Sequence, residues 1–145
     1  MSSRYLLDTN IISHMMRDID GAASRKFREV VSTELSLPIY TSVIVECELQ
    51  FGLNRKPNER LNRAYDRIIG AVKVLPLDSE VVPHYARLRA QLEAAGTPIG
   101  PNDALIAAHA LALDATLVSA DVEFERVPGL KVENWLAATP AQLPA

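Results

Sequence analysis

The sequence predicts an α/β domain, a three-layer α/β/α arrangement with a mainly parallel central sheet. Its length of 145 residues suits one ordinary domain. Short apolar runs that are typical of strands alternate along the chain with segments in which apolar residues recur at helical spacing. Because parallel neighbours in a sheet need helical crossovers, this alternation favours a parallel sheet with helices on both faces.

In the first half of the chain, the apolar spacing sets the expected elements. Apolar residues recur three and four positions apart in 9–17, 22–34 and 57–72, as on one face of a helix. Pro57 is favourable near a helix start. Up to residue 72 we expect strands at 4–7 and 37–42 and helices at 9–17, 22–34, 43–53 and 57–72.

In the second half, a stripe of apolar residues and a glycine define the longest helix. Val81, Tyr85, Leu88 and Leu92 share one helical face, and Gly96 is a natural terminator. The remaining elements are strands at 73–77, 116–119 and 131–135 and helices at 79–96 and 101–113. We expect one domain over 1–136, followed by a short Pro/Ala-rich tail, 137–145, that frays.

The composition excludes several classes of protein. Hydrophobic residues make up 48% and charged residues 23%, as in ordinary globular domains. The one cysteine, Cys47, cannot form an internal disulfide, and we expect it to pack as a small apolar residue. No stretch approaches the ~20 apolar residues of a membrane span, so we expect a cytoplasmic protein. The net charge of −3 argues against a protein that coats nucleic acid electrostatically, although a local basic patch is compatible with it.

Acidic residues follow or precede the predicted strands at several points. Asp8 ends the first strand, Asp121 closely follows a late strand, and Asp103 opens the helix before that strand. The second strand leads into a helix that carries Glu46 and Glu48. Because ligands of open parallel sheets bind beyond the carboxyl ends of the strands, these acids are expected to converge at one edge.

Helix geometry distinguishes the two glutamates. Residues two apart on an α-helix lie about 200° apart, so Glu46 and Glu48 cannot share a face. The neighbours of Glu48 at three and four residues are mostly apolar, whereas those of Glu46 are mixed. Glu48 is therefore the better candidate for an inward carboxylate that needs a partner, and Glu46 is the second choice.

Each acid also has an ordinary structural interpretation. Asp8 could cap a helix, Asp103 could complement a helix dipole, and Asp121 could be a turn residue. Taken together, however, crowded carboxylates repel one another unless a cation neutralises them. A site of oxygen ligands without histidine or cysteine indicates Mg²⁺ or Mn²⁺ and phosphate chemistry. Supporting polar contacts, or simple turn bonds, are expected from the neighbouring side chains of Thr9, Asn10 and Ser119.

The acids lie within four longer stretches: "YLLDTNIIS", "TSVIVECELQFG", "GTPIGPNDALIAAHAL" and "LVSADVEFERVPGLKVENW". Taken in order, they resemble the PIN-domain ribonucleases of the VapC toxin type over nearly the whole chain. The resemblance implies a PIN-like fold, an endoribonuclease dependent on Mg²⁺ or Mn²⁺, and the toxin half of a bacterial toxin-antitoxin pair. It also implies a cognate antitoxin that covers the active site, a homodimer, and an RNA substrate, with transfer RNA suggested by the third stretch.

Matching these stretches residue by residue implies four catalytic and metal-binding residues. They are Asp8 from "LLDTN", Glu48 four positions before Gly52, Asp103 from "PNDAL" and Asp121 from "VSAD". The match to Glu48 agrees with the preference for Glu48 over Glu46 that its apolar helical neighbours indicate. Whether one or two ions bind stays open.

Basic residues suggest how an acidic protein could hold RNA. Arg60, Arg63 and Arg67 share one face of the helix at 57–72, near Arg55 and Lys56. They form either an ordinary solvated helix exterior or a phosphate-binding rim beside the acids. Other contributors could be Arg87 and Arg89.

Three other interpretations are less well supported by the residues. A receiver-like signalling domain would use Asp78 as its phosphorylatable aspartate, but the expected lysine after a late strand is missing. An aspartate-nucleophile phosphotransferase needs a second aspartate where Asn10 stands. An inactive PIN-like interaction module is disfavoured because all four acids are present. His109, about 120° around its helix from Asp103, is expected to pack or face a partner.

Overall fold

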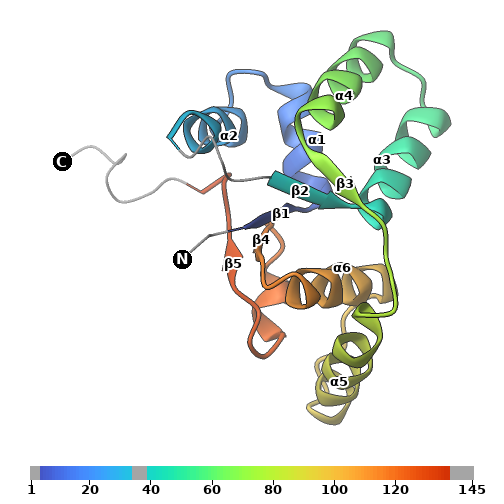
Figure 1. The fold of residues 1–145 in the computed structure, drawn as a ribbon. Helices are drawn as coiled ribbons and strands as arrows, with labels where there is room; N and C mark the ends of the chain where they lie inside the picture. Colours follow the sequence, from blue (N-terminus) through green and yellow to red (C-terminus); the bar gives the residue numbers. More distant parts are fainter. Residues whose placement is uncertain (1–3, 34–38, 138–145) are drawn as a thin grey trace.

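A computed structural model describes residues 4–33 and 39–137, which form a sheet between two layers of helices (Figure 1). Within these ranges the sheet has five strands, all parallel, in the order β3-β2-β1-β4-β5. Their bounds are β1 Tyr5–Leu7, β2 Ile39–Ser42, β3 Lys73–Leu75, β4 Thr116–Val118 and β5 Val132–Glu133. The predicted three-layer α/β/α fold with a parallel sheet is confirmed.

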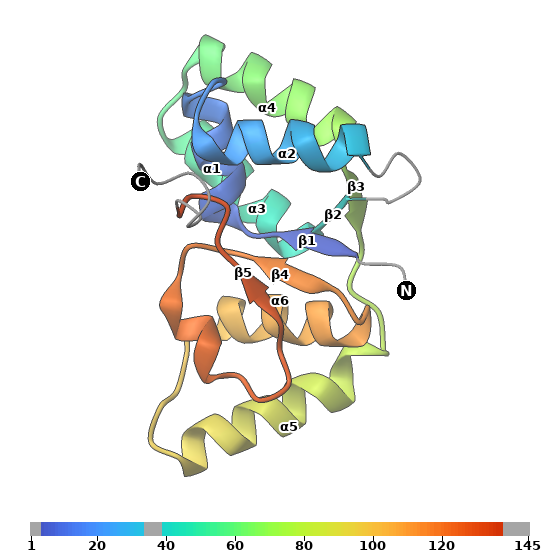
Figure 2. The same cartoon turned by 90° about the vertical axis from the view of Figure 1, so that its left-hand side faces the viewer.

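The α-helices of the described residues cover the two faces of the sheet unequally. They are α1 Thr9–Arg17, α2 Ala22–Thr33, α3 Val43–Arg55, α4 Glu59–Ala71, α5 Val81–Ala94 and α6 Pro101–Ala112. Figure 2 shows α1, α2, α3 and α4 on one side of the sheet and α5 and α6 on the other. None of the helices within the described ranges is long and apolar enough to cross a membrane.

The strand order reverses at β1, in the middle of the sheet. Leu6 pairs with Tyr40 of β2 on one side and with Leu117 of β4 on the other. From β1 the chain builds outward through β2 and β3 and then returns to add β4 and β5. Ligands of open α/β sheets bind beyond the strand ends at such a reversal. A ligand-binding site is therefore expected at the carboxyl ends of β1 and β4.

The core fixes the central strands against both helix layers. Leu6, Leu7 and Leu117 are completely buried, as is Ile106 of α6. Burying a large aliphatic side chain stabilises a fold by about 1.5–3 kcal/mol relative to leaving it exposed. The strand ends that carry the acids are thus held by some of the most buried residues of the molecule.

The predicted helices and strands differ from the observed ones by a few residues at their ends. The helix predicted at 57–72 begins at Glu59, because the Asn58 side-chain oxygen accepts a hydrogen bond from the Leu61 N–H at 3.0 Å and caps it. Gly96 ends α5 as predicted, in a left-handed conformation with φ of 73°. The last residue predicted for the second helix, Glu34, the start of the second strand at 37–38, and the tail from 138 onward lie outside the described residues.

Two features differ from expectation. Residues Val122–Arg126 form a short 3-10 helix, η1, that the apolar spacing did not predict. Cys47 was expected to pack in the interior, but it is exposed on α3. The reason is the helix phase: the buried residues of α3 are Val45, Leu49 and Leu53, and Cys47 lies across the helix from this stripe.

Candidate active site

Four segments deliver acidic side chains to the reversal point of the sheet. Asp8 directly follows β1 and precedes α1, and Asp121 follows β4 and precedes η1. Asp103 lies in the first turn of α6, and Glu48 lies on α3, which begins directly after β2. Chain segments that are distant in sequence therefore meet here because parallel strands present their carboxyl ends at one edge.

Asp8 is the most buried of the four acids, with 4% of its surface exposed. One carboxylate oxygen accepts a hydrogen bond from the Thr9 N–H at 2.7 Å, so Asp8 does cap α1. The other oxygen accepts bonds from the Ser119 hydroxyl at 2.7 Å and from the Asn10 amide at 3.3 Å. The carboxylate is thus fixed in orientation from both sides.

Asn10 and Ser119 also connect the start of α1 to the loop that carries Asp121. The Asn10 side-chain oxygen accepts a hydrogen bond from the Ala120 N–H at 3.0 Å, and its amide donates to the Ser119 hydroxyl at 3.2 Å. The Asp121 N–H donates to the same hydroxyl at 3.1 Å. The polar neighbours suggested by the sequence therefore set the position of Asp121 relative to Asp8.

The two glutamates of α3 point to different partners. Glu48 accepts a hydrogen bond from the Thr9 hydroxyl at 2.5 Å, which ties it to the start of α1. Glu46 instead accepts a bond from the Tyr65 hydroxyl of α4 at 3.2 Å. The geometry therefore places Glu48 in the acidic group and Glu46 outside it, although Phe51, one of the apolar neighbours that suggested an inward Glu48, is exposed.

The electrostatics show that the acids act on one another. The pKa of Asp103 is raised to about 6, first by burial and then by repulsion from Asp8, Asp121 and Glu48, with Glu123 adding to it. The pKa of Asp8 is also raised, mainly by burial, with repulsion from Glu48 and Asp121. Hydrogen bonds from Ser119 and the Thr9 N–H oppose that rise. At neutral pH the site concentrates negative charge that its hydrogen bonds only partly compensate.

The donor set fits a hard divalent cation. Within residues 4–33 and 39–137, no lysine, arginine or histidine forms an ion pair with any of the four acids. In the same ranges no three histidine, cysteine or acidic side chains converge closely enough to hold a metal ion directly. Mg²⁺ usually keeps several waters and takes one or two direct carboxylates. The oxygen-only donors and the uncompensated charge match that preference.

One acid of the site was missed by sequence reasoning. Glu123 lies on η1, two residues after Asp121, and its charge contributes to the raised pKa of Asp103. The Glu123 N–H donates to the Asp121 carboxylate at 2.9 Å, so Asp121 caps η1. The sequence signal for Glu123 was the Asp-x-Glu spacing in "ADVEFE". This spacing brings Glu123 close to Asp121 when the segment forms a helical turn, which the apolar spacing did not predict.

The predicted arginine face lies away from the acids. Arg60, Arg63 and Arg67 line a concavity of about 390 Å³ together with Arg17, the last residue of α1. Since α1 rises about 1.5 Å per residue, this end lies about 12 Å along the helix from Thr9. Of the two alternatives, the solvated helix exterior therefore fits this placement better than a phosphate-binding rim directly beside the acids.

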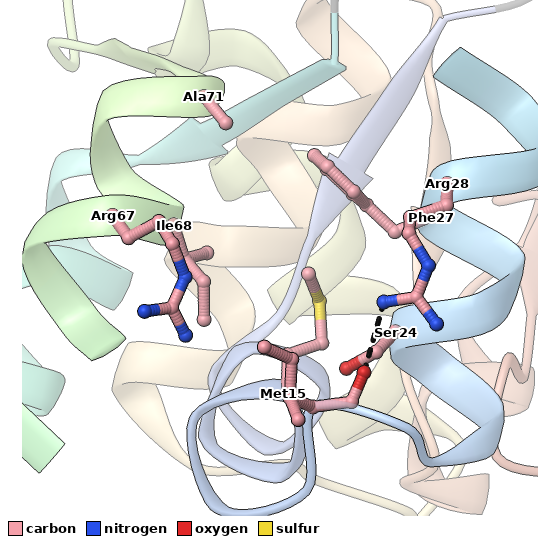
Figure 3. Close-up of a pocket in the computed structure, with 8 residues that line it drawn as sticks. Met15, Ser24, Phe27, Arg28, Arg67, Ile68 and Ala71 are labelled. Carbon is pink, nitrogen blue, oxygen red and sulfur yellow. Dashed lines mark hydrogen bonds between the residues drawn. The ribbon is translucent and has the colours of Figure 1, made fainter. Parts of the chain in front are cut away.

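A second concavity of about 260 Å³ lies next to the arginine face and is mainly apolar (Figure 3). It lies between α1, α2 and α4, and Met15, Phe27 and Ile68 are among its lining residues. Arg67 and Ile19 line both concavities. These two hollows of the surface are thus at the end of α1 opposite to the acids.

His109 takes no part in the acidic group. It is buried in α6, and its Nδ1 lies 2.9 Å from the Ser42 hydroxyl. Burial lowers its pKa, with Asp78 opposing the shift. Of the two roles expected for His109, packing or facing a partner, the structure supports packing.

Comparison with known proteins gives a consistent result. A family model for the PIN domain matches residues 5–130. Ribonuclease VapC2 of Rickettsia felis is 34% identical over 133 residues, which cover 90% of this chain and 97% of that protein. The tRNA(fMet)-specific endonuclease VapC of Salmonella typhimurium is 30% identical over 134 residues, covering 91% and 98%. The crystal structure of VapBC2 from Rickettsia felis bound to a promoter DNA fragment superposes with a TM-score of 0.83 at 32% identity, covering 91% and 98%.

Proposed function

Because this chain belongs to the PIN-domain family, among the VapC ribonucleases, we propose that it is a divalent-metal-dependent endoribonuclease that acts as the toxin of a bacterial toxin-antitoxin pair. The observation that carries the proposal is the meeting of four carboxylates at the reversal point of the sheet. Burial and, after it, repulsion from the other acids raise the pKa of Asp103, and this cost of holding negative charge gives the site a reason to take up a cation.

The proposed metal-binding and catalytic residues are Asp8, Glu48, Asp103 and Asp121. Asp8, Glu48 and Asp103 would hold Mg²⁺ or Mn²⁺, one or two of them directly and the rest through water, and Asp121 would complete the coordination or orient a water. Such an ion supplies positive charge that neutralises the phosphate and acidifies water. The chain's own contribution is to hold the Asp8 carboxylate in one orientation through Ser119 and Asn10.

The substrate and partners are proposed from the relatives. The Salmonella relative is named for transfer RNA cleavage, and the Rickettsia felis structure contains toxin and antitoxin together. We propose transfer RNA as the substrate class, a cognate antitoxin that covers the acids, a toxin homodimer and a cytoplasmic location. We also propose a single nuclease domain over 1–136.

The receiver-like alternative finds no supporting contact among the described residues. Asp78, its expected phosphorylation site, accepts a hydrogen bond from the Glu80 N–H at 3.0 Å and lies in the turn before α5. It does not contribute to the raised pKa of Asp103 or Asp8. A phosphotransfer assay with a small phosphodonor would reveal such an activity directly.

The test is RNA cleavage by the purified protein with Mg²⁺, with Mn²⁺ and with excess EDTA. We expect cleavage with either metal and none with EDTA, and sequencing of the fragment ends would identify the cut site. Asp103→Asn should abolish cleavage, whereas Asp66→Asn, which alters an exposed carboxylate on α4, should not. Metal-independent cleavage, or full activity of the Asp103 variant, would contradict the proposal.

A further inference from the structure

An exposed aromatic ring lies on the same face of α3 as Glu48. Phe51 is three residues after Glu48 and is 64% exposed. The guanidinium of Arg55, one turn further on, lies 5.4 Å from the centre of the Phe51 ring. Residues three, four and seven apart on a helix share a face, so Glu48, Phe51 and Arg55 form one stripe that leads away from the acidic group.

Phe51 differs from the other exposed apolar residues in its surroundings. A single exposed apolar side chain is ordinary on a protein surface, and Val82 on α5 is similarly exposed at 62%. Phe51 is distinguished by the stacked arginine and by its place next to an acid of the proposed active site. An arginine over an aromatic ring within about 6 Å is a cation-π contact, which holds both side chains in place.

Gly52 leaves open space beside this stripe. A Cβ added at Gly52 would meet no atom within 4 Å, so packing does not require a glycine here. A glycine inside a helix costs roughly 0.5–1 kcal/mol relative to alanine. Gly52 lies one turn after Glu48 and directly follows Phe51, so the absence of a side chain leaves room for a ligand beside the acid.

We propose that Phe51 and Arg55 form a platform, the Phe51-Arg55 platform, on which an unpaired base of the RNA substrate stacks. The inference rests on the ribonuclease function proposed above. Proteins that recognise single-stranded or looped RNA stack splayed bases on aromatic rings and on the planes of arginine side chains. Arg55 and the following Lys56 add positive charge for the adjoining phosphate, which the acidic group cannot attract without its metal ion.

The platform would bind the base next to the bond that is cut. Phe51 would hold the base while the acids act on a phosphate of the same strand, so the enzyme would prefer an unpaired nucleotide at one fixed position. Stacking is tolerant of base identity, because every base has a π face. The platform would therefore select loop structure over sequence.

Binding of fluorescent RNA oligonucleotides in EDTA tests the platform without cleavage. Phe51→Ala should weaken binding about 5- to 150-fold, the range expected from loss of one base-aromatic stack. Phe51→Trp should bind at least as tightly as the unchanged protein. Val82→Ala, the matched exposed control, should leave affinity unchanged.

An abasic scan then locates the stacked nucleotide. Replacing one nucleotide at a time by an abasic residue should weaken binding sharply at one position in the unchanged protein, and Phe51→Ala should lose that position-specific effect. Equal affinity of Phe51→Ala and the unchanged protein would overturn the platform. The platform would also be overturned if Phe51→Ala formed a smaller oligomer and bound RNA as tightly as before. Phe51 would then belong to a contact between copies of the chain. Because these binding measurements need neither metal nor cleavage, they test the platform separately from the proposed nuclease activity.

Discussion

The two ends of α1 carry opposite charges in different physical settings. At its start, Asp8 is buried and its carboxylate accepts three hydrogen bonds. At its end, Arg17 and the arginines of α4 line an open concavity, with Asp18 as an acid among them, and the side chain of Arg63 is 70% exposed. Both charges suit the helix dipole, which favours anions at the start and cations at the end.

The difference determines how each end can contribute. Charges in water are screened over about 10 Å at 0.1 M salt, whereas buried charges are screened much less. The acids should therefore act through fixed geometry, and their replacement should have large effects at any salt concentration. The arginines should act through long-range attraction, with smaller effects that depend on salt.

Of the replacements at the two ends of α1, Asp8→Asn is expected to have the largest effect. It keeps the size of the side chain but removes the charge that a divalent ion would meet, so cleavage should fall on the order of 100- to 1,000-fold. The far-ultraviolet circular dichroism should stay unchanged, since an asparagine can also cap α1. Measurement is by initial cleavage rates, and a variant with normal rates would remove Asp8 from the mechanism.

Ser119→Ala should have the next largest effect. The Ser119 hydroxyl donates to Asp8 and accepts from the Asp121 N–H, so its loss removes one of the three hydrogen bonds to Asp8 and loosens the Asp121 backbone. Residues that orient metal ligands typically affect metal affinity or activity by about 10- to 100-fold. The metal concentration needed for half-maximal cleavage should rise in Ser119→Ala. An unchanged metal requirement would mean that Ser119 only closes the loop.

Replacing the three arginines of α4 with glutamine should give a smaller, salt-dependent effect. The slope of log affinity for single-stranded RNA against log salt should decrease by about 0.7 for each phosphate that the variant no longer neutralises. Arg25→Gln on α2 is the control, since it removes an equally solvated charge. If the slope is the same in the triple variant and in the control, the α4 arginines are a solvated exterior, which the sequence left as an alternative.

The smallest expected effect is on the pH dependence of stability in metal-free protein. The pKa of Asp103 in the fold, about 6, is above its ordinary value of 3.8. The unfolded chain therefore loses this proton first as pH rises, and the fold loses stability between about pH 4 and pH 6. Asp103→Asn should remove that loss, so the variant should be more stable than the parent at pH 7 and nearly equal near pH 4. Urea unfolding at the two pH values measures this.

Much of the fold could be predicted because its signals are local. Apolar spacing defined the helices, and strand-helix alternation implied the parallel sheet without any long-range information. The 3-10 helix η1 could not be predicted, because its five residues have no complete apolar period and its start depends on the Asp121 cap. Cys47 was misplaced because only the packing of Val45, Leu49 and Leu53 sets the phase of α3.

The sequence proposes four acids for the candidate site but does not predict all of their surroundings. Asp8 and Asp121 followed from strand ends, whereas the orientation of Glu48 depends on the phase of α3, which packing sets. Glu123 depended on the turn of η1, and the place of the α4 arginines depended on how α4 packs against α1. Distances between segments that are remote in sequence are set by tertiary packing. The apolar periodicity of the sequence carries no information about these distances.

The central claim is that the four carboxylates repel one another until a divalent ion joins them. Thermal unfolding of the parent and of Asp103→Asn at pH 7, with and without Mn²⁺, tests it most directly. Without metal, the variant should unfold at a higher temperature than the parent. Mn²⁺ should raise the unfolding temperature of the parent, because ligands that bind only the folded state stabilise it, and should raise that of the variant much less. A parent that does not respond to Mn²⁺, or a variant that responds equally, would contradict the claim.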